Sequence, residues 1–125
     1  MQRILIADDK ASSRELVRTI LQHLGYEVEE ASDGIQALQG IEADPPDLVL
    51  LDLQMPGLTG NEVVTRVRQN PALQKLPVVA LTASAMTGDR ERALLSGFTG
   101  YLSKPVNLST LRAEVSRLLT PEICP

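Results

Sequence analysis

Side chains suited to chemistry stand at the ends of several apolar runs of this chain. Asp8 and Asp9 follow the run RILIA, Asp52 lies within LVLLDL, Thr82 ends PVVALT, and Lys104 follows GYLS. Each run is short and mostly aliphatic, as expected of strands in a parallel sheet. Because ligands bind where the carboxyl ends of parallel strands meet, we expect these side chains to converge at one edge of the sheet.

Three neighbouring carboxylates repel one another unless a positive charge neutralises them. Mg²⁺ is suited to this task, since it binds one or two carboxylates together with water and a phosphate. An aspartate can also act as a nucleophile and form an aspartyl phosphate. Positive charge on the phosphoryl oxygens would come from Mg²⁺ and Lys104, and Thr82 would donate a hydrogen bond. The set is sufficient for magnesium-dependent phosphoryl transfer to an aspartate.

The rest of the sequence alternates between apolar runs and helical patterns. The expected strands are Arg3–Ala7, Glu27–Ala31, Leu48–Leu53, Pro77–Thr82 and Gly100–Ser103. The expected helices are one that carries Leu16, Val17, Ile20, Leu21 and Leu24 and ends at Gly25, then Gly34–Ala43, Gly60–Asn70, about Met86–Ser96, and one that starts after an Asn107 cap. Strict alternation predicts an α/β fold with a doubly wound, five-stranded parallel sheet, and the polar segment Glu27–Ala31 is expected at its edge.

The composition argues against several other kinds of protein. The 125 residues contain one Cys, Cys124, and one His, His23, so neither an intrachain disulfide nor a zinc site of several such ligands can form. The net charge of −4 argues against a nucleic-acid or acidic membrane surface. We find no signal peptide and no apolar stretch of membrane-spanning length, and expect a cytoplasmic protein. We expect one domain over residues 1–120 and a tail over 121–125.

The site residues lie in motifs that resemble those of a known family. The motifs are Asp8-Asp9, Asp52-x-x-Met55-Pro56-x-x-x-Gly60, Thr82-Ala83 and Tyr101-x-x-Lys104-Pro105. In this order and at this spacing they make the chain similar, over residues 2 to about 119, to the receiver domain of two-component response regulators. The resemblance implies a flavodoxin-like (βα)5 fold with the strand order 2-1-3-4-5.

The resemblance also implies how the site works. Asp52 would be the phosphoacceptor of a histidine kinase or a histidine phosphotransfer protein, and the chain would assist its own phosphorylation and dephosphorylation without being an enzyme. The ligands of Mg²⁺, for which Mn²⁺ could substitute, would be Asp8 (largely through water), Asp9, Asp52 and the main-chain carbonyl of Gln54. Lys104 would contact the phosphoryl group, and its bond to Pro105 would be cis.

A conformational switch is implied as well. Thr82 would swing toward the phosphoryl group, and Tyr101 would move from a solvent-exposed position into the space that Thr82 leaves. This would repack the surface of the fourth helix, fifth strand and fifth helix, where a downstream protein partner would bind. Gln54 and Ser84, each two residues beyond Asp52 or Thr82, would tune the lifetime of the phosphoryl group.

For the phosphodonor we predict contact with the first helix, including Lys10, Ala11, Arg14 and Val17. We expect Arg14→Glu to slow transfer from a protein donor but not from a small molecule.

Simpler structural roles also exist: Asp9 could cap the first helix, and His23 is expected at the surface. An aspartate inside LVLLDL, in contrast, is costly to bury without a partner.

Other functions remain open. A magnesium-dependent phosphatase with an aspartate nucleophile would use an Asp-x-Asp pair, but here the stretch is Asp52-Leu53-Gln54. A pseudo-receiver would keep the fold as a binding module that works without phosphorylation. A nucleotide-binding module is disfavoured because no glycine-rich phosphate loop follows a strand. The chain could be a stand-alone regulator or the receiver of a hybrid kinase.

Overall fold

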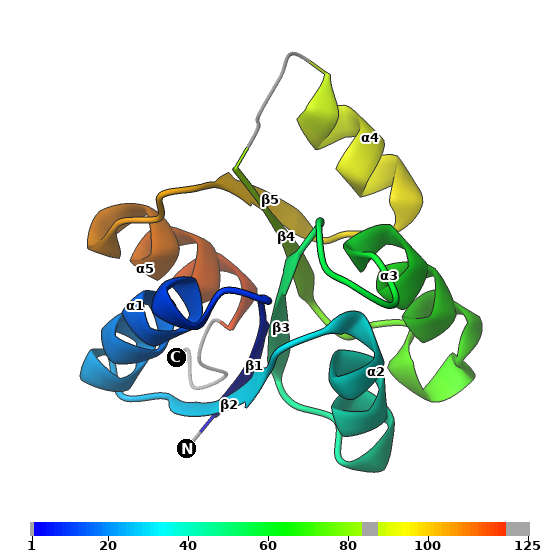
Figure 1. Ribbon diagram of the computed structural model, residues 1–125, viewed down its shortest axis with the longest axis horizontal. Helices are drawn as coiled ribbons and strands as arrows, with labels where there is room; N and C mark the ends of the chain where they lie inside the picture. Colours follow the sequence, from blue (N-terminus) through cyan, green and yellow to red (C-terminus); the bar gives the residue numbers. More distant parts are fainter. Residues whose placement is uncertain (1, 84–87, 120–125) are drawn as a thin grey trace, which may run out of the picture.

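Five parallel strands form one sheet in the spatial order β2-β1-β3-β4-β5 (Figure 1). The computed structural model describes residues 2–83 and 88–119. The strands are β1 (Arg3–Ala7), β2 (Glu27–Ala31), β3 (Leu48–Asp52), β4 (Val78–Thr82) and β5 (Gly100–Ser103). Each neighbouring pair is parallel, so every connection crosses over through a helix. The predicted fold class and strand order are confirmed.

Helices cover both faces of this sheet. They are α1 (Ala11–His23), α2 (Gly34–Ala43), α3 (Gly60–Gln69), α4 (Asp89–Ser96) and α5 (Leu108–Leu118), with a short 3-10 helix at Pro71–Leu73. α1 and α5 pack on one face, and α2, α3 and α4 lie on the other (Figure 1). Among the described residues, no helix has the length and apolar character needed to cross a membrane.

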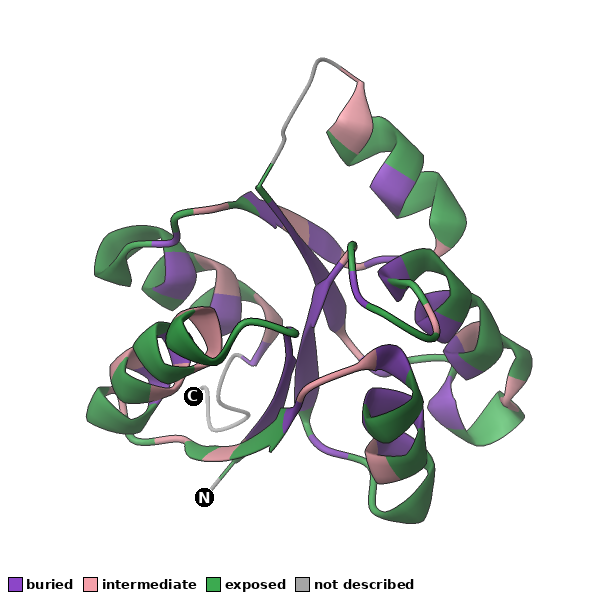
Figure 2. Ribbon diagram, viewed as in Figure 1, coloured by how far each residue is buried: buried purple, intermediate pink, exposed green. Residues whose placement is uncertain are grey.

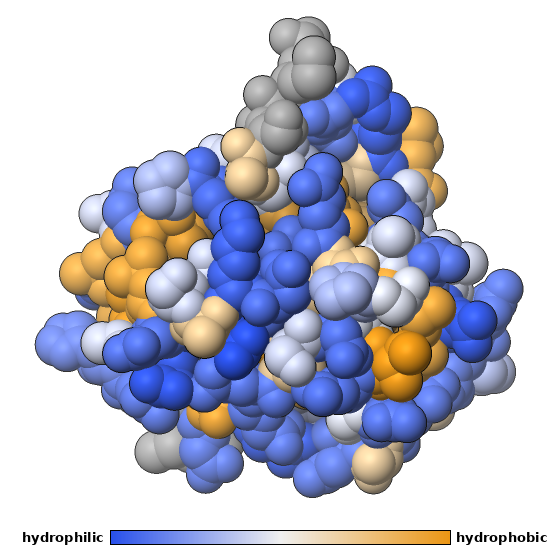
Figure 3. Space-filling view, in the orientation of Figure 1, coloured by the Kyte–Doolittle hydropathy of each residue, from blue (hydrophilic) through white to orange (hydrophobic). Residues whose placement is uncertain are grey.

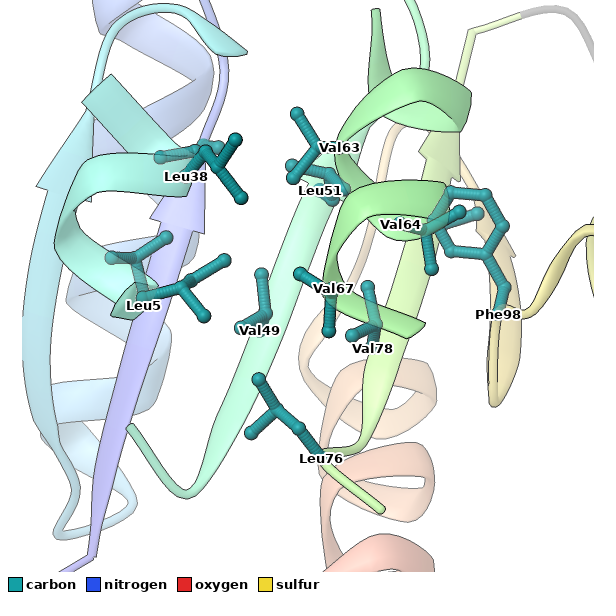
Figure 4. Packing of buried hydrophobic residues seen from close by; sticks show 14 of the residues in the cluster. Leu5, Leu38, Val49, Leu51, Val63, Val64, Val67, Leu76, Val78 and Phe98 are labelled. Carbon is teal, nitrogen blue, oxygen red and sulfur yellow. The ribbon is translucent and has the colours of Figure 1, made fainter. Parts of the chain in front are cut away.

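Side chains of the central strands alternate between two apolar clusters. Leu5 and Val49 belong to the cluster with α2 and α3, whereas Ile4 and Leu50 belong to the cluster with α1 and α5. Buried residues accordingly line the strands and the inner sides of the helices (Figure 2), and Figure 4 shows α3 packed on the strands. Truncating a buried leucine of this kind to alanine costs about 2–5 kcal/mol. The core therefore fixes the position of the strand ends.

The helix after β3 ends one residue earlier than predicted. The sequence predicts Gly60–Asn70, but α3 ends at Gln69 and Asn70 has an extended backbone. The reason is Pro71, which disfavours a helical conformation in the residue before it. Asn70 instead accepts a hydrogen bond from the amide of Ala72 and caps the 3-10 helix.

Most of the other predicted bounds are close to the observed ones. β3 and β4 each lack one residue of the predicted Leu48–Leu53 and Pro77–Thr82. α4 is described over Asp89–Ser96, whereas the prediction begins at about Met86, which lies outside the described residues.

Side-chain caps begin three of the described α-helices. Asp33, Thr59 and Asn107 accept hydrogen bonds from the first turns of α2, α3 and α5, and the predicted Asn107 cap is confirmed. α1 instead begins at Lys10 without a side-chain cap bond. The alternative role of Asp9 as the cap of this helix is therefore wrong, which leaves its carboxylate available for the strand edge.

Candidate functional site

The carboxyl ends of four strands bring the predicted site residues together. Asp8 and Asp9 follow β1, Asp52 ends β3, Thr82 ends β4, and Lys104 follows β5. Asp8, Asp52 and Thr82 are 1%, 5% and 6% exposed, and they are the buried polar or charged residues in the part of the chain that the structure describes. Because burial of unpaired polar groups is unfavourable, their contacts show what this edge of the sheet can hold.

The Lys104 ammonium bridges the two buried carboxylates. Its Nζ atom lies 2.6 Å from Oδ2 of Asp8 and 2.9 Å from Oδ2 of Asp52. Each Oδ1 atom accepts a main-chain hydrogen bond, in Asp8 from the amide of Lys10 at 2.9 Å and in Asp52 from the amide of Gln54 at 3.0 Å. Both carboxylates are therefore held in one orientation before any ligand binds.

The pKa of Lys104 lies above its ordinary value. Partial burial acts to lower this pKa, but the hydrogen bonds to Asp52 and Asp8 and their negative charges raise it by more. The amine is consequently a proton-bearing cation at neutral pH. It can donate to carboxylate or phosphoryl oxygens.

A divalent cation fits beside these carboxylates. Asp8, Asp9 and Asp52 each place a carboxylate oxygen within 4.8 Å of the other two, and Asp9 is exposed. Three carboxylates facing one ammonium leave an excess of formal negative charge. Hard oxygen ligands with one side open to water are those that Mg²⁺ prefers. The donor set therefore fits the ion that the sequence predicts.

Arg14 of α1 holds the main chain at Asp8, a contact that sequence reasoning missed. Its Nη1 atom donates to the carbonyl oxygen of Asp8 at 2.8 Å, and its Nε atom donates to Glu30 at 3.2 Å. Glu30 of β2 also accepts from Arg18 at 2.7 Å. A bond to a main-chain carbonyl leaves no mark in the residue types, so the sequence had no signal for it beyond the position of Arg14 on the helix next to the site.

Two glycines hold the loop that follows Asp52. A Cβ atom at Gly60 would lie 2.7 Å from the carbonyl oxygen of Asp52, and one at Gly34 in α2 would overlap the carbonyl oxygen of Leu58. The obstructing atoms belong to the main chain and cannot move aside as a side chain can. Only glycine lets the loop approach both helices. Gly60 is in the family motif, whereas Gly34 has no sequence signal of this role.

Tyr101 lies in a different position from the expected one. The resemblance implies a solvent-exposed ring before phosphorylation, but the residue is half-buried and packs against the cluster of α2 and α3. Its hydroxyl is buried and has no hydrogen-bond partner among the residues that the structure describes. Burial without a partner costs about 1–3 kcal/mol for such a group. The apolar packing of the ring must offset this cost.

The remaining candidate residues include some that the structure describes and some that it does not. Gln54 is exposed, and the peptide bond between Lys104 and Pro105 is cis, as the resemblance implies. Ser84, Cys124 and the predicted tail 121–125 lie outside the described residues. His23 is exposed at the end of α1, as expected.

Comparisons with known sequences place this geometry in a family. Residues 4–116 match the model of the response regulator receiver domain. The chain is 39% identical over 115 residues to the sensor protein EvgS of Escherichia coli (strain K12). This alignment covers 92% of the chain and 9% of EvgS. The chain is 35% identical over 105 residues to the polar-differentiation response regulator DivK of Brucella anthropi, covering 84% of this chain and 85% of DivK. The chain thus spans less than a tenth of the sensor protein and most of the regulator.

Comparisons with solved structures also find proteins that share this fold. The chemotaxis protein CheY4 of Vibrio cholerae is 36% identical and superposes with a TM-score of 0.88, covering 95% of this chain and 99% of that one. The receiver domain of a sensor histidine kinase from Pseudomonas aeruginosa PAO1 is 33% identical with a TM-score of 0.88, covering 96% and 98%. That structure has a magnesium ion coordinated in its active-site cleft.

Proposed function

Because the chain belongs to the family of response regulator receiver domains of two-component systems, we propose that Asp52 accepts a phosphoryl group in a magnesium-dependent reaction. One observation carries the proposal: Asp52 is a buried carboxylate at a strand end, 2.9 Å from the Lys104 ammonium and next to two further aspartates. Burial of a carboxylate in this setting lowers the stability of the fold. Its presence here therefore indicates a function that needs it.

The residues have separate tasks in this reaction. An oxygen of Asp52 attacks the phosphorus atom, the bond from phosphorus to the donor breaks, and the leaving group departs with the electron pair. Lys104 exchanges its hydrogen bond with Asp52 for one with a phosphoryl oxygen, and it retains its hydrogen bond with Asp8. The hydroxyl of Thr82 donates to a second phosphoryl oxygen. Each of these contacts stabilises charge that the transfer brings into the site.

The metal-binding residues would be the three aspartates and one main-chain group. Asp8, Asp9, Asp52 and the carbonyl of Gln54 would hold Mg²⁺, or Mn²⁺ in its place, and the ion would neutralise charge on the phosphoryl oxygens. Arg14 supports this arrangement because it fixes the main chain at Asp8. The chain itself thus assists both the gain and the loss of its phosphoryl group, without turning over a separate substrate.

The phosphodonor would dock on the α1 side of the site. A mostly apolar groove of about 310 Å³ lies there, lined by Leu16 and Val17 of α1 and by Pro105 and Val106 after β5, with Lys104 at one side. Figure 3 shows an apolar patch over α1 and α5, beside a hydrophilic centre. A helix of a histidine kinase or phosphotransfer protein could place its phosphohistidine over Asp52 from this groove.

The structure favours a different variant for testing this docking from the one that the sequence suggests. The sequence suggests Arg14→Glu, with phosphorylation by small molecules left intact. Arg14 also holds the carbonyl of Asp8, so this substitution would disturb the site itself. Leu16 is 47% exposed in the groove and makes no such contact with the aspartates. It is the better position to change.

The output would use the other side of the molecule. Phosphorylation would draw Thr82 toward the phosphoryl group and settle Tyr101 in its inner position, which repacks the surface of α4, β5 and α5. Leu94 and Leu95 of α4 are already exposed there, at 41% and 87%. Apolar side chains of this kind suit a protein partner rather than a nucleic acid.

Intact-mass spectrometry tests the proposal. After incubation with acetyl phosphate and Mg²⁺, we expect one added phosphoryl group, which requires Mg²⁺ and is absent from Asp52→Asn. Beryllofluoride, a mimic of the acyl phosphate, should bind to the wild type and not to the variant. Failure of both reagents on the folded wild type would instead indicate a pseudo-receiver, and catalytic turnover of p-nitrophenyl phosphate would indicate a phosphatase.

A further inference from the structure

A second hollow lies on the side of the site opposite the donor groove. This cavity of about 420 Å³ lies between the loop after β3, α3 and α4, and its walls include Gln54, Thr82, Asn61, Asp89 and Arg92. Two of these residues lie next to the proposed phosphoacceptor. Thr82 ends β4, the strand beside β3, and the main-chain amide of Gln54 donates a hydrogen bond to Oδ1 of Asp52. The cavity therefore opens onto the reacting centre.

Arg92 gives this cavity a cation. Among the described lining residues it alone is positively charged, and its side chain is 66% exposed. It pairs with Asp89 one helical turn earlier. The Asp89 side chain is 20% exposed, but the guanidinium lies at the surface, where an ion pair contributes about 0.2–1 kcal/mol, so Arg92 can leave this partner for a better one at small cost. The planar guanidinium binds a carboxylate through two parallel hydrogen bonds.

We propose that Arg92 receives the leaving carboxylate of small acyl phosphate donors. The inference rests on the phosphoacceptor function of Asp52 proposed above and assigns to Arg92 a role in the departure of the leaving group. In the reaction, an Asp52 oxygen forms a bond to phosphorus, the bond between phosphorus and the acyl oxygen breaks, and the carboxylate leaves with that electron pair. No proton is needed, because the leaving group is already a stable anion.

The physical reason is the charge that develops on the leaving oxygen. In the intact acyl phosphate this oxygen is uncharged, whereas in the transition state it becomes a carboxylate oxygen. A cation in the cavity therefore stabilises the transition state more than the ground state and raises the rate. A donor with a neutral leaving group gains nothing from Arg92. Phosphoramidate, which releases ammonia, and a phosphohistidine, which releases imidazole, are such donors.

The groove and the cavity thus differ in the donor that each suits. The groove beside α1 is mostly apolar and is suited to a protein helix. The cavity beside α4 is more polar and carries Arg92. This contrast in chemistry on two sides of one carboxylate favours entry of a small anion from the α4 side.

The experiment compares two donors on three variants. Initial rates of phosphorylation are measured by intact mass with acetyl phosphate and with phosphoramidate, at equal Mg²⁺ concentration and low salt. Arg92→Gln removes the cation, and Arg92→Lys keeps the charge without the planar fork. Arg90→Gln is the matched control, because Arg90 is exposed on the same helix and is not among the described residues that line the cavity.

We expect Arg92→Gln to slow the reaction with acetyl phosphate by up to about fivefold, which corresponds to the upper end of the energy of an exposed charge contact. Its rate with phosphoramidate should equal that of the wild type. Arg92→Lys should recover part of the loss, and Arg90→Gln should lose nothing. The difference between the two donors should shrink as salt rises, since salt screens an exposed charge.

Two outcomes would overturn the inference and are distinguishable from failure of the proposed function. If wild type is phosphorylated and Arg92→Gln matches it with acetyl phosphate, Arg92 does not act on the leaving group. If Arg92→Gln slows both donors equally, the residue acts on the phosphoryl group or on α4 instead. If wild type gains no phosphoryl group from either donor, the acceptor function itself is wrong, and the inference falls with it.

Discussion

At the scale of single residues, the site is a balance of charge in a confined space. Asp8 and Asp52 are buried and share one ammonium, and Asp9 adds a third carboxylate whose oxygen lies within 4.8 Å of the others. Such crowding is unfavourable without a cation. Because we propose that the same charges bind Mg²⁺, this unfavourable crowding would lower stability in return for function.

Asp9→Asn tests this trade. We expect the free energy of unfolding without Mg²⁺ to rise by about 1 kcal/mol, the Coulomb energy of two charges about 4 Å apart in water. Mg²⁺ should then stabilise the variant much less than the wild type, because a ligand stabilises only as far as it binds. Urea unfolding with and without Mg²⁺ measures both effects. Glu42→Gln removes an exposed charge in α2 and should leave the response to Mg²⁺ unchanged; an equal loss of response in both variants would contradict the assignment.

Glu30 gives the fold a dependence on pH outside the metal site. Its hydrogen bond to Arg18 lowers the pKa of Glu30 below the usual value of 4.5; burial acts in the opposite direction, and Arg14 adds to the lowering. The folded state therefore binds this proton less readily than the unfolded state. The resulting stability is present above about pH 5 and is lost as pH falls through the lowered pKa.

The variant Glu30→Gln tests the direction of this dependence of stability on pH. It should be less stable than the wild type by about 0.5 kcal/mol at pH 7, the usual scale for an exposed pair. The difference should vanish as the pH falls below the lowered pKa. Urea unfolding at several pH values measures it, with Glu27→Gln on the exposed part of the same strand as control. A difference that persists unchanged at low pH would rule out the ion pair as its source.

At the scale of elements, the loop between β3 and α3 is held by contact with main-chain atoms. Gly60 leaves no room for a Cβ atom next to the carbonyl of Asp52. We expect Gly60→Ala to lower the free energy of unfolding by about 1–3 kcal/mol, as overpacking does. It should also slow phosphorylation, because the displaced residue is the proposed acceptor, Asp52.

Gly40→Ala is the matched control for that change. Gly40 lies inside α2, and a Cβ atom there would meet only the end of the flexible Leu5 side chain, at 3.2 Å. Alanine favours a helix by up to about 1 kcal/mol over glycine. This variant should be as stable as the wild type or more so, and its phosphorylation rate should not change. Equal effects of the two substitutions would show that the loop contact is unimportant.

The groove along α1 gives a prediction about protein donors. Leu16→Glu should slow transfer about tenfold from any histidine-phosphorylated kinase or phosphotransfer protein that phosphorylates the wild type, because it brings a charge into an apolar interface. Phosphorylation by acetyl phosphate should be unaffected. Leu95→Glu makes the same change on α4, outside the groove, and should leave the donor reaction intact. If Leu16→Glu also spared the protein donor, the groove would not be the docking site.

At the scale of the whole molecule, the sequence predicts the fold because local and global signals agree. Aliphatic runs of strand length mark β1, β3 and β4, and the helices α1, α2, α3 and α5 each bury a periodic set of side chains. The clustering of the site residues is also predicted, because parallel strands bring their carboxyl ends to one edge of the sheet. What the sequence could not predict depends on distances between remote segments: the bond from Arg14 to the Asp8 carbonyl, the approach of Gly34 to Leu58, and the inner position of Tyr101.

The half-buried ring of Tyr101 has an optical consequence. The chain contains no Trp and only two Tyr, so no tryptophan emission masks that of tyrosine. Tyr26 packs with the α1 and α5 cluster, on the face of the sheet opposite the cluster that Tyr101 contacts. Tyr26→Phe would leave a single fluorophore on the proposed switch. The unlabelled protein would then report its own phosphorylation as a change in tyrosine emission, in real time and without a partner.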